Sequence, residues 1–175
     1  LLCSQAAAQG KRKVVCPSGG NAGLATAVAA VSLGLQACIV VPHTTPESTR
    51  ARIRKTGAEV IVHGKVWDDA NQRAKELSQA ADTEYVPAFD HPVLWEGHSS
   101  MVDEILDDCP QVDTVVTSVG GGGLLAGILT GLLRHDRRDC RIITCDTTGA
   151  ASFAAAVQAG HPVRLSRIDS VATSH

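Results

Sequence analysis

The chain has 175 residues, with sixteen basic and eighteen acidic side chains and a net charge of -2. This balance excludes a broad electrostatic grip on nucleic acid or on an anionic membrane, so we expect neither partner. Hydrophobic residues make up 44% of the chain and charged residues 19%, which excludes an intrinsically disordered protein. Aromatic residues make up only 3%, so the core must be built mainly from Ala, Val, Leu and Ile.

Short β-branched runs alternate with helical stretches along the chain. The predicted strands cover residues 13–16, 37–41, 58–62, 84–86, 113–119 and 141–145. The predicted helices cover residues 21–33, 46–56, 66–81, 92–108, 122–134 and 151–159. This alternation predicts an α/β fold of parallel sheets with helices on both faces. We place a domain boundary near residues 87–92, between a small four-stranded domain (1–90) and part of a larger α/β domain (91–175).

Residues 14–42 carry no charged side chain, a length that would allow a membrane span. Turn-forming residues interrupt this stretch at Pro17, Gly19, Gly20 and Gly34, so we predict two buried strands and a helix instead of a span.

The six cysteines form no CxxC pair, and the seven histidines are scattered, so no zinc site is predicted. Free thiols of this kind fit a reducing compartment, and we expect a cytoplasmic protein. The only methionine is Met101, so we expect the chain to be an excerpt of a longer protein.

Two strand-to-helix turns are rich in glycine, at residues 18–23 (SGGNAG) and 120–123 (GGGG). At the carboxyl edge of a parallel sheet, such a turn exposes backbone N–H groups at the start of a helix, where they bind anions. Glycine alone can also serve a tight turn. Two such turns in one chain nevertheless favour a shared anionic ligand.

The second turn has an alternative interpretation. Gly121-x-Gly123-x-x-Ala126 fits the dinucleotide fingerprint, and Asp146 follows the next predicted strand where an acid would bind a ribose. A nicotinamide-binding oxidoreductase therefore stays open as an alternative. Against it, the fingerprint normally opens its domain, whereas four βα units come first here.

Four motifs together resemble the serine dehydratase family, whose members are fold-type II pyridoxal-phosphate (PLP) enzymes that deaminate L-serine and L-threonine. The motifs are residues 16–23 (CPSGGNAG), 89–92 (FDHP), 95–98 (WEGH) and 118–125 (SVGGGGLL). Residues 64–68 (GKVWD) look especially like the serine dehydratase-like branch. The resemblance implies a tryptophan synthase β-like fold, with the chain covering about half of a family member.

The resemblance also implies roles for individual residues. The phosphate of pyridoxal phosphate would bind at Gly120, Gly121, Gly122, Gly123 and Leu124. The substrate carboxylate would bind at Ser18, Gly19, Gly20, Asn21 and Ala22. Asn21 would also face the 3'-oxygen of the cofactor, and Phe89 would lie beside the active site.

A monovalent cation such as K+ is implied at Asp146, Ala150 and Ser152, where Asp146 replaces the glutamate usual in the family. By the resemblance, the full-length protein would convert L-serine to pyruvate and ammonia, and L-threonine to 2-oxobutanoate, as a homodimer. Deamination is favoured over racemisation because Gly19 lacks a hydroxyl that could act as an acid.

None of the five lysines lies in the Ser-x-Phe-Lys setting of the family's Schiff-base lysine, which by alignment would precede Leu1. No catalytic residue is therefore assigned within the chain. A non-catalytic truncated product stays open as a further alternative.

Overall fold

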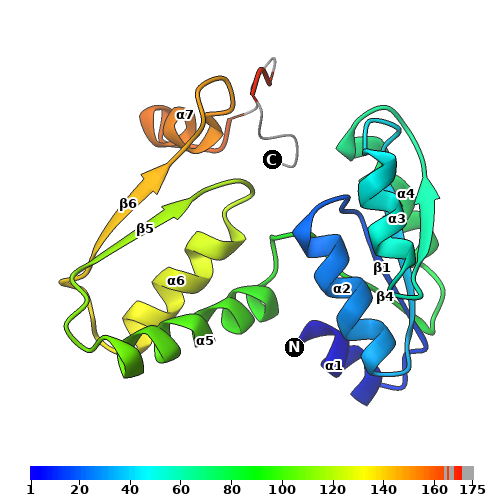
Figure 1. The fold of residues 1–175 in the computed structure, drawn as a ribbon, viewed down its shortest axis with the longest axis horizontal. Coiled ribbons are helices and arrows are strands. Elements are labelled where there is room, and N and C mark those ends of the chain that lie inside the picture. The colour runs from blue at the N-terminus through cyan, green and yellow to red at the C-terminus, as the bar shows by residue number, and fades with distance from the viewer. Residues whose placement is uncertain (164, 166–167, 171–175) are drawn as a thin grey trace. The chain divides into compact units, whose positions relative to one another are not determined.

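The computed structural model describes residues 1–163, 165 and 168–170. They fall into two compact units that divide between Ala88 and Phe89. Figure 1 labels the helices of both units and the strands β1, β4, β5 and β6. Among the described residues, no helix has the length and the apolar character needed to cross a membrane.

The first unit is a four-stranded sheet with helices on both faces. Its elements are α1 (Leu2–Ala8), β1 (Lys13–Cys16), α2 (Asn21–Ser32), β2 (Gln36–Val41), α3 (Glu47–Arg54), β3 (Glu59–Val62), α4 (Trp67–Leu77) and β4 (Thr83–Tyr85). All strand pairs are parallel, in the order β3-β2-β1-β4. The carboxyl ends of the four strands therefore share one edge of the sheet.

Side chains alternate between the two faces of the central strands β1 and β2. Val15, Cys38 and Val40 point to one face and form a core cluster with Ala70 and Ala74 of α4. On the opposite face, Ile39 lies close to Gly23 at the start of α2. Both faces are covered, so the strands are buried almost throughout and must be continuous runs of apolar residues.

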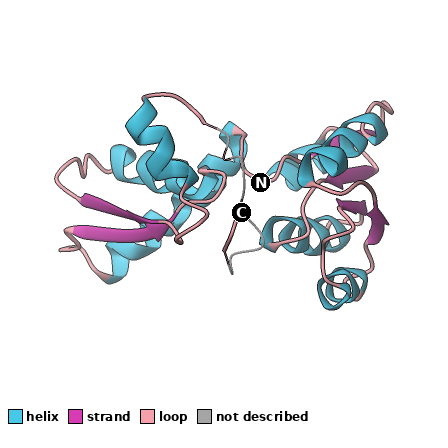
Figure 2. Ribbon diagram, turned by 90° about the horizontal axis from the view of Figure 1, so that it is seen from above, coloured by secondary structure: helices cyan, strands magenta, loops and turns pink. Residues whose placement is uncertain are grey.

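The second unit contains a two-stranded parallel sheet, and Figure 2 shows its strands side by side. Its elements are α5 (Pro92–Asp108), β5 (Thr114–Ser118), α6 (Gly123–Arg134), β6 (Arg141–Cys145) and α7 (Ser152–Ala159). One face of the sheet packs on α5 and α6 through Val115 and Ile142, which contact a cluster around Val102 and Ile128.

Helices α5 and α6 approach each other closely because α6 presents glycines to α5. Gly123, Gly127 and Gly131 are spaced four residues apart and so lie on one face of the helix. A Cβ at Gly131 would lie 2.6 Å from the Cβ of Val102, and one at Gly127 would overlap the Cβ of His98. Side chains at these positions would push the helices apart.

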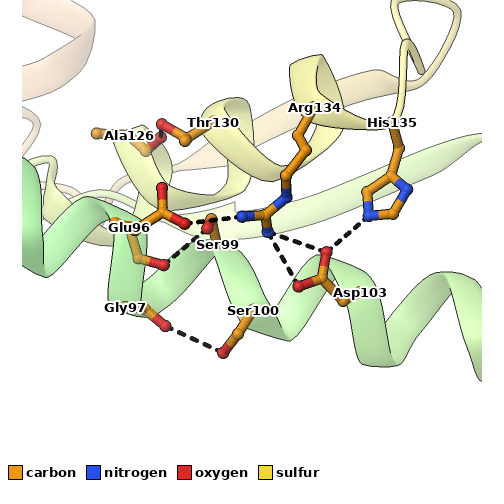
Figure 3. Close-up of polar contacts among 9 residues, drawn as sticks. All are labelled: Glu96, Gly97, Ser99, Ser100, Asp103, Ala126, Thr130, Arg134 and His135. Carbon is orange, nitrogen blue, oxygen red and sulfur yellow. Dashed lines mark hydrogen bonds and ion pairs between the residues drawn. The ribbon is translucent and has the colours of Figure 1, made fainter. Parts of the chain in front are cut away.

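A polar network joins the same two helices on their exposed side (Figure 3). Arg134 of α6 donates to Glu96 at 2.8 Å and to Asp103 at 2.9 Å, both on α5. His135 Nε2 lies 2.6 Å from Asp103 Oδ1. The hydrogen bond from His135, aided by the charge of Arg134, holds the pKa of Asp103 below its usual value.

The structure confirms the predicted α/β fold, all six predicted strands and all six predicted helices. The ends of these elements differ from the predicted ends by at most four residues. Helix α4 ends at Leu77 instead of residue 81. Helix α1 was not predicted from the sequence. It has only seven residues and no capping side chain, and burial of Leu2, Cys3 and Ala6 against the rest of the unit accounts for it.

We predict that Asp103→Asn lowers the melting temperature at pH 7. The folded-state pKa of Asp103 lies below the unfolded value, so its carboxylate stabilises the fold above the unfolded pKa. That stabilisation is lost as the pH falls through the folded pKa. The two melting curves should therefore converge once the pH falls below the folded-state pKa of Asp103, as measured by thermal denaturation. Glu104→Gln, at an exposed position on the same helix, is the control. A deficit that persists at acidic pH contradicts the prediction.

Candidate functional site

The first glycine-rich loop joins the carboxyl end of β1 to the start of α2. Ser18 Oγ accepts a hydrogen bond from the N–H of Gly20 at 3.2 Å, which folds the loop back on itself. Gly20 is the N-cap of α2 and has no side chain to cap the helix. The N–H groups of Asn21, Ala22 and Gly23 begin the helix and have no acceptor within it, so they can bind a carboxylate.

Close contacts explain the glycines of this loop. A Cβ at Gly23 would overlap the carbonyl oxygen of Ser18, and one at Gly19 would lie 2.7 Å from Thr45 Oγ1. Thr45 is buried and follows β2, so it supports the loop from the neighbouring strand end. A second support comes from α4, where Trp67 Nε1 donates to the carbonyl of Pro17 at 2.6 Å.

The thiol of Cys16, directly before this loop, is completely buried. Burial raises its pKa to about 12, and burial likewise raises the pKa of Cys38 to about 11. Both thiols stay protonated at neutral pH and are not nucleophiles. All six cysteines are free thiols, as expected from their spacing.

The second glycine-rich loop joins the carboxyl end of β5 to the start of α6. Gly122 is the N-cap of α6 and has a φ of 86°, a left-handed conformation that glycine adopts without strain. The N–H groups of Gly123, Leu124 and Leu125 begin this twelve-residue helix without acceptors inside it. Helix dipole and N–H groups together favour a phosphate at this end.

Phe89 covers this second loop within the same unit. A Cβ at Gly121 would overlap the ring of Phe89, and one at Gly123 would lie 2.7 Å from the carbonyl oxygen of Phe89. That carbonyl accepts a hydrogen bond from Trp95 Nε1 at 2.9 Å. The structure therefore brings Phe89 to the tetraglycine loop, and its place beside a cofactor stays a prediction.

The residues present fit a phosphate group such as that of pyridoxal phosphate. A Cβ at Gly121 or Gly123 would meet Phe89, whereas one at Gly122 would meet nothing within 4 Å. The loop is therefore open at Gly122, where an anion can approach the backbone. The residues predicted to bind the substrate carboxylate form one loop of the first unit, and those predicted to bind the phosphate form one loop of the second.

The residues predicted to hold a cation lie at the start of α7, whose first residue is Ser152. Asp146 Oδ2 accepts from the N–H of Ala154 at 3.0 Å and so caps α7, while the carbonyl of Ala150 accepts from the N–H of Ser152 at 2.9 Å. Within the described part of the chain, no group of three or more His, Cys, Asp or Glu side chains could hold a metal ion. The cation therefore stays a prediction.

Three supporting residues were missed by the sequence reasoning: Thr45, and Trp67 and Trp95 in their hydrogen-bonding roles. Thr45 carries no signal, because its contact with Gly19 depends on how neighbouring strands pair. The tryptophans carry a weak signal, since they are the only two in the chain and each indole N–H needs an acceptor when buried.

Curated relatives cover most of the chain at substantial identity. It is 48% identical to the human protein named "Serine dehydratase-like", over 99% of this chain and 53% of that protein. It is 46% identical to "L-serine dehydratase" of Dictyostelium discoideum, over 87% of this chain and 47% of that protein. The chain thus spans about half the length of these relatives.

A solved structure of similar fold is the fungal L-serine ammonia-lyase from Rhizomucor miehei. It is 36% identical, with a TM-score of 0.88 over 98% of this chain and 56% of that chain. The fold is therefore that of fold-type II pyridoxal-phosphate enzymes, and the predicted resemblance to serine dehydratases is confirmed.

A family model described as "Pyridoxal-phosphate dependent enzyme" matches residues 1–175. This match decides against the dinucleotide interpretation of Gly121, Gly123 and Asp146. It also agrees with the bare glycine loop at the start of α6, which suits a phosphate. The chain belongs to the pyridoxal-phosphate-dependent enzyme family.

Proposed function

We propose that the full-length gene product containing this chain deaminates L-serine to pyruvate and ammonia, and L-threonine to 2-oxobutanoate. The observation that carries the proposal is the pair of backbone anion sites at strand ends, one of them covered by Phe89. A dehydratase needs both a phosphate site for its cofactor and a carboxylate site for its substrate. The relatives named L-serine dehydratase support this substrate class.

The residues of the chain would hold and orient the reactants. Gly120 to Leu124 would bind the cofactor phosphate through backbone N–H groups, and the loop at Ser18 to Ala22 would bind the substrate carboxylate in the same way. The amide of Asn21 can donate to a ring oxygen. The ring of Phe89 excludes water from one side of the phosphate loop. Pyridoxal phosphate, when bound, supplies the electron sink for the negative charge left at Cα.

The geometry of the first loop also supports elimination over racemisation. Gly19 offers no hydroxyl that could protonate Cα from the opposite face. A side chain there would meet Thr45, since even a Cβ would lie 2.7 Å from Thr45 Oγ1. The net reaction removes the hydroxyl of Cβ and the proton of Cα as water, and a water molecule then replaces the nitrogen at Cα, which leaves as ammonia.

We predict that Asn21→Ala in the full-length product lowers kcat/KM for L-serine about tenfold or more. Asn21 is exposed in the structure, and a hydrogen bond that a bound ligand covers contributes about 1–3 kcal/mol, which Ala removes. Steady-state kinetics at saturating cofactor measure the effect. Gln72→Ala, on the exposed face of α4, should leave the kinetics unchanged. Wild-type kinetics in Asn21→Ala would remove the role assigned to this loop.

We further propose a monovalent cation at Asp146, Ala150 and Ser152. Replacing K+ with tetramethylammonium should lower the pyruvate-forming rate several-fold, because the large ion cannot enter. Asp146→Asn should lower the rate and blunt this dependence. Since Asn can still accept from the N–H of Ala154, the cap on α7 survives and thermal stability should change little. Activity that is indifferent to both the salt and the substitution would refute the cation site.

Residues 1–175 expressed alone should release no pyruvate from L-serine. The lysines of the chain, Lys11, Lys13, Lys55, Lys65 and Lys75, all lie in the first unit and outside the family's Schiff-base setting. Borohydride reduction with pyridoxal phosphate, followed by peptide mass mapping, should find no specifically labelled lysine. One labelled lysine together with turnover would show that the catalytic lysine lies within the chain.

We also propose that the full-length product is a cytoplasmic homodimer with a small amino-acid substrate. The support is the resemblance to the serine dehydratase family together with the free thiols. Light scattering coupled to size-exclusion chromatography tests the dimer, and a monomer would contradict it.

A further inference from the structure

Each of the two glycine-rich loops is tied to the rest of its unit by one tryptophan. Trp67 and Trp95 are the only tryptophans of the chain. One lies in the first unit and the other in the second. The indole N–H of Trp67 donates to the carbonyl of Pro17, directly before the first loop. The indole N–H of Trp95 donates to the carbonyl of Phe89, which packs on the second loop.

Trp67 holds the loop at Ser18 to Ala22 from α4. Its Nε1 donates to the carbonyl of Pro17 at 2.6 Å, across fifty positions of sequence. Trp67 is the first residue of α4, and the turn before it is fixed because Asp69 accepts from the N–H groups of Lys65 and Val66. These two backbone N–H donors, Lys65 first and then Val66, hold the pKa of Asp69 below its usual value. The indole therefore projects from a fixed turn onto the carbonyl just before Ser18.

Trp95 holds the segment that covers the tetraglycine loop. Its Nε1 donates to the carbonyl of Phe89 at 2.9 Å. The same carbonyl would lie 2.7 Å from a Cβ at Gly123, so it rests against the first residue of α6. The carbonyl of Trp95 would in turn lie 2.9 Å from a Cβ at Gly127, one helical turn further on. Trp95 thus fixes Phe89 and lies against α6 at once.

We propose that Trp67 and Trp95 are positioning residues, the first for the substrate-carboxylate loop and the second for the cofactor-phosphate loop. The proposal rests on the function proposed above. A backbone anion site has no flexible side chain that can readjust to its ligand. Its affinity for the anion therefore depends on the orientation of the N–H groups, and the hydrogen bonds from the indoles fix that orientation.

Each tryptophan acts within its own unit, so the two substitutions should separate two ligands. Trp95→Phe keeps an aromatic ring and removes the N–H. It should weaken binding of pyridoxal phosphate to the apoenzyme about three- to tenfold and leave the KM for L-serine at saturating cofactor unchanged. Trp67→Phe should raise that KM about three- to tenfold and leave cofactor affinity unchanged. Each variant is the matched control for the other.

The measurements are an absorbance titration of the full-length apoenzyme with pyridoxal phosphate and steady-state kinetics with L-serine. A wild-type protein that neither binds pyridoxal phosphate nor forms pyruvate would refute the proposed function. A functional wild type whose two variants match it in both constants, or shift both constants together, would refute the positioning roles alone.

A second measurement uses the wild-type protein, so it does not depend on whether the variants fold. Amide hydrogen exchange of the wild-type apoenzyme, with and without pyridoxal phosphate, should show residues 89–95 and 120–124 gaining protection together. Protection gained at 120–124 without any change at 89–95 would overturn the role of Trp95. The same comparison with L-serine added to the holoenzyme tests residues 17–23 against 65–69 for Trp67.

Discussion

Exposure of backbone N–H groups in glycine-rich turns is the constraint on which the rest of this structure depends. The N–H groups at the start of α2 and of α6 point along the axis of each helix and carry its positive end. A ligand reaches them only where side chains are absent, so the turns before both helices are built from glycine. Parallel pairing supplies the location, because each of these turns follows a strand at the carboxyl edge of its sheet.

Removing side chains from a loop also removes the contacts that would hold it in place, and the surrounding residues restore them. Thr45 and Trp67 contact the loop after β1, and Phe89 and Trp95 secure the loop after β5. The support continues along α6, where the glycine face lets α5 approach, and ends at the ion pairs of Arg134. Contacts from neighbouring segments thus hold both glycine-rich loops.

The pattern of apolar runs and the turn-forming glycines and prolines were enough to predict the strands, the α/β fold and both glycine-rich loops. Buried parallel strands must be continuous apolar runs, and Gly34, Pro46 and Gly57 mark element ends. The same signals failed for α1, whose formation depends on packing. They also failed for the bonds from Trp67 and Trp95 and for the cap that Asp146 provides to Ala154, since these contacts depend on where separate segments meet in three dimensions.

Both loops lie within long stretches that carry no Asp, Glu, Lys or Arg, residues 14–42 and 114–133. After the tetraglycine loop, the next basic side chain in the sequence is Arg134, at the far end of α6. It stabilises the negative end of the helix dipole there and is paired with Glu96 and Asp103. Within this stretch, a phosphate at the other end would meet oriented N–H groups instead of basic side chains. Backbone N–H groups need no flexible side chain to become ordered when the ligand binds. Surroundings without charged side chains have a lower local dielectric, which strengthens each hydrogen bond that these N–H groups donate. The uncharged stretch at residues 14–42, whose length would allow a membrane span, thus suits a backbone anion site as well as residues 114–133 do.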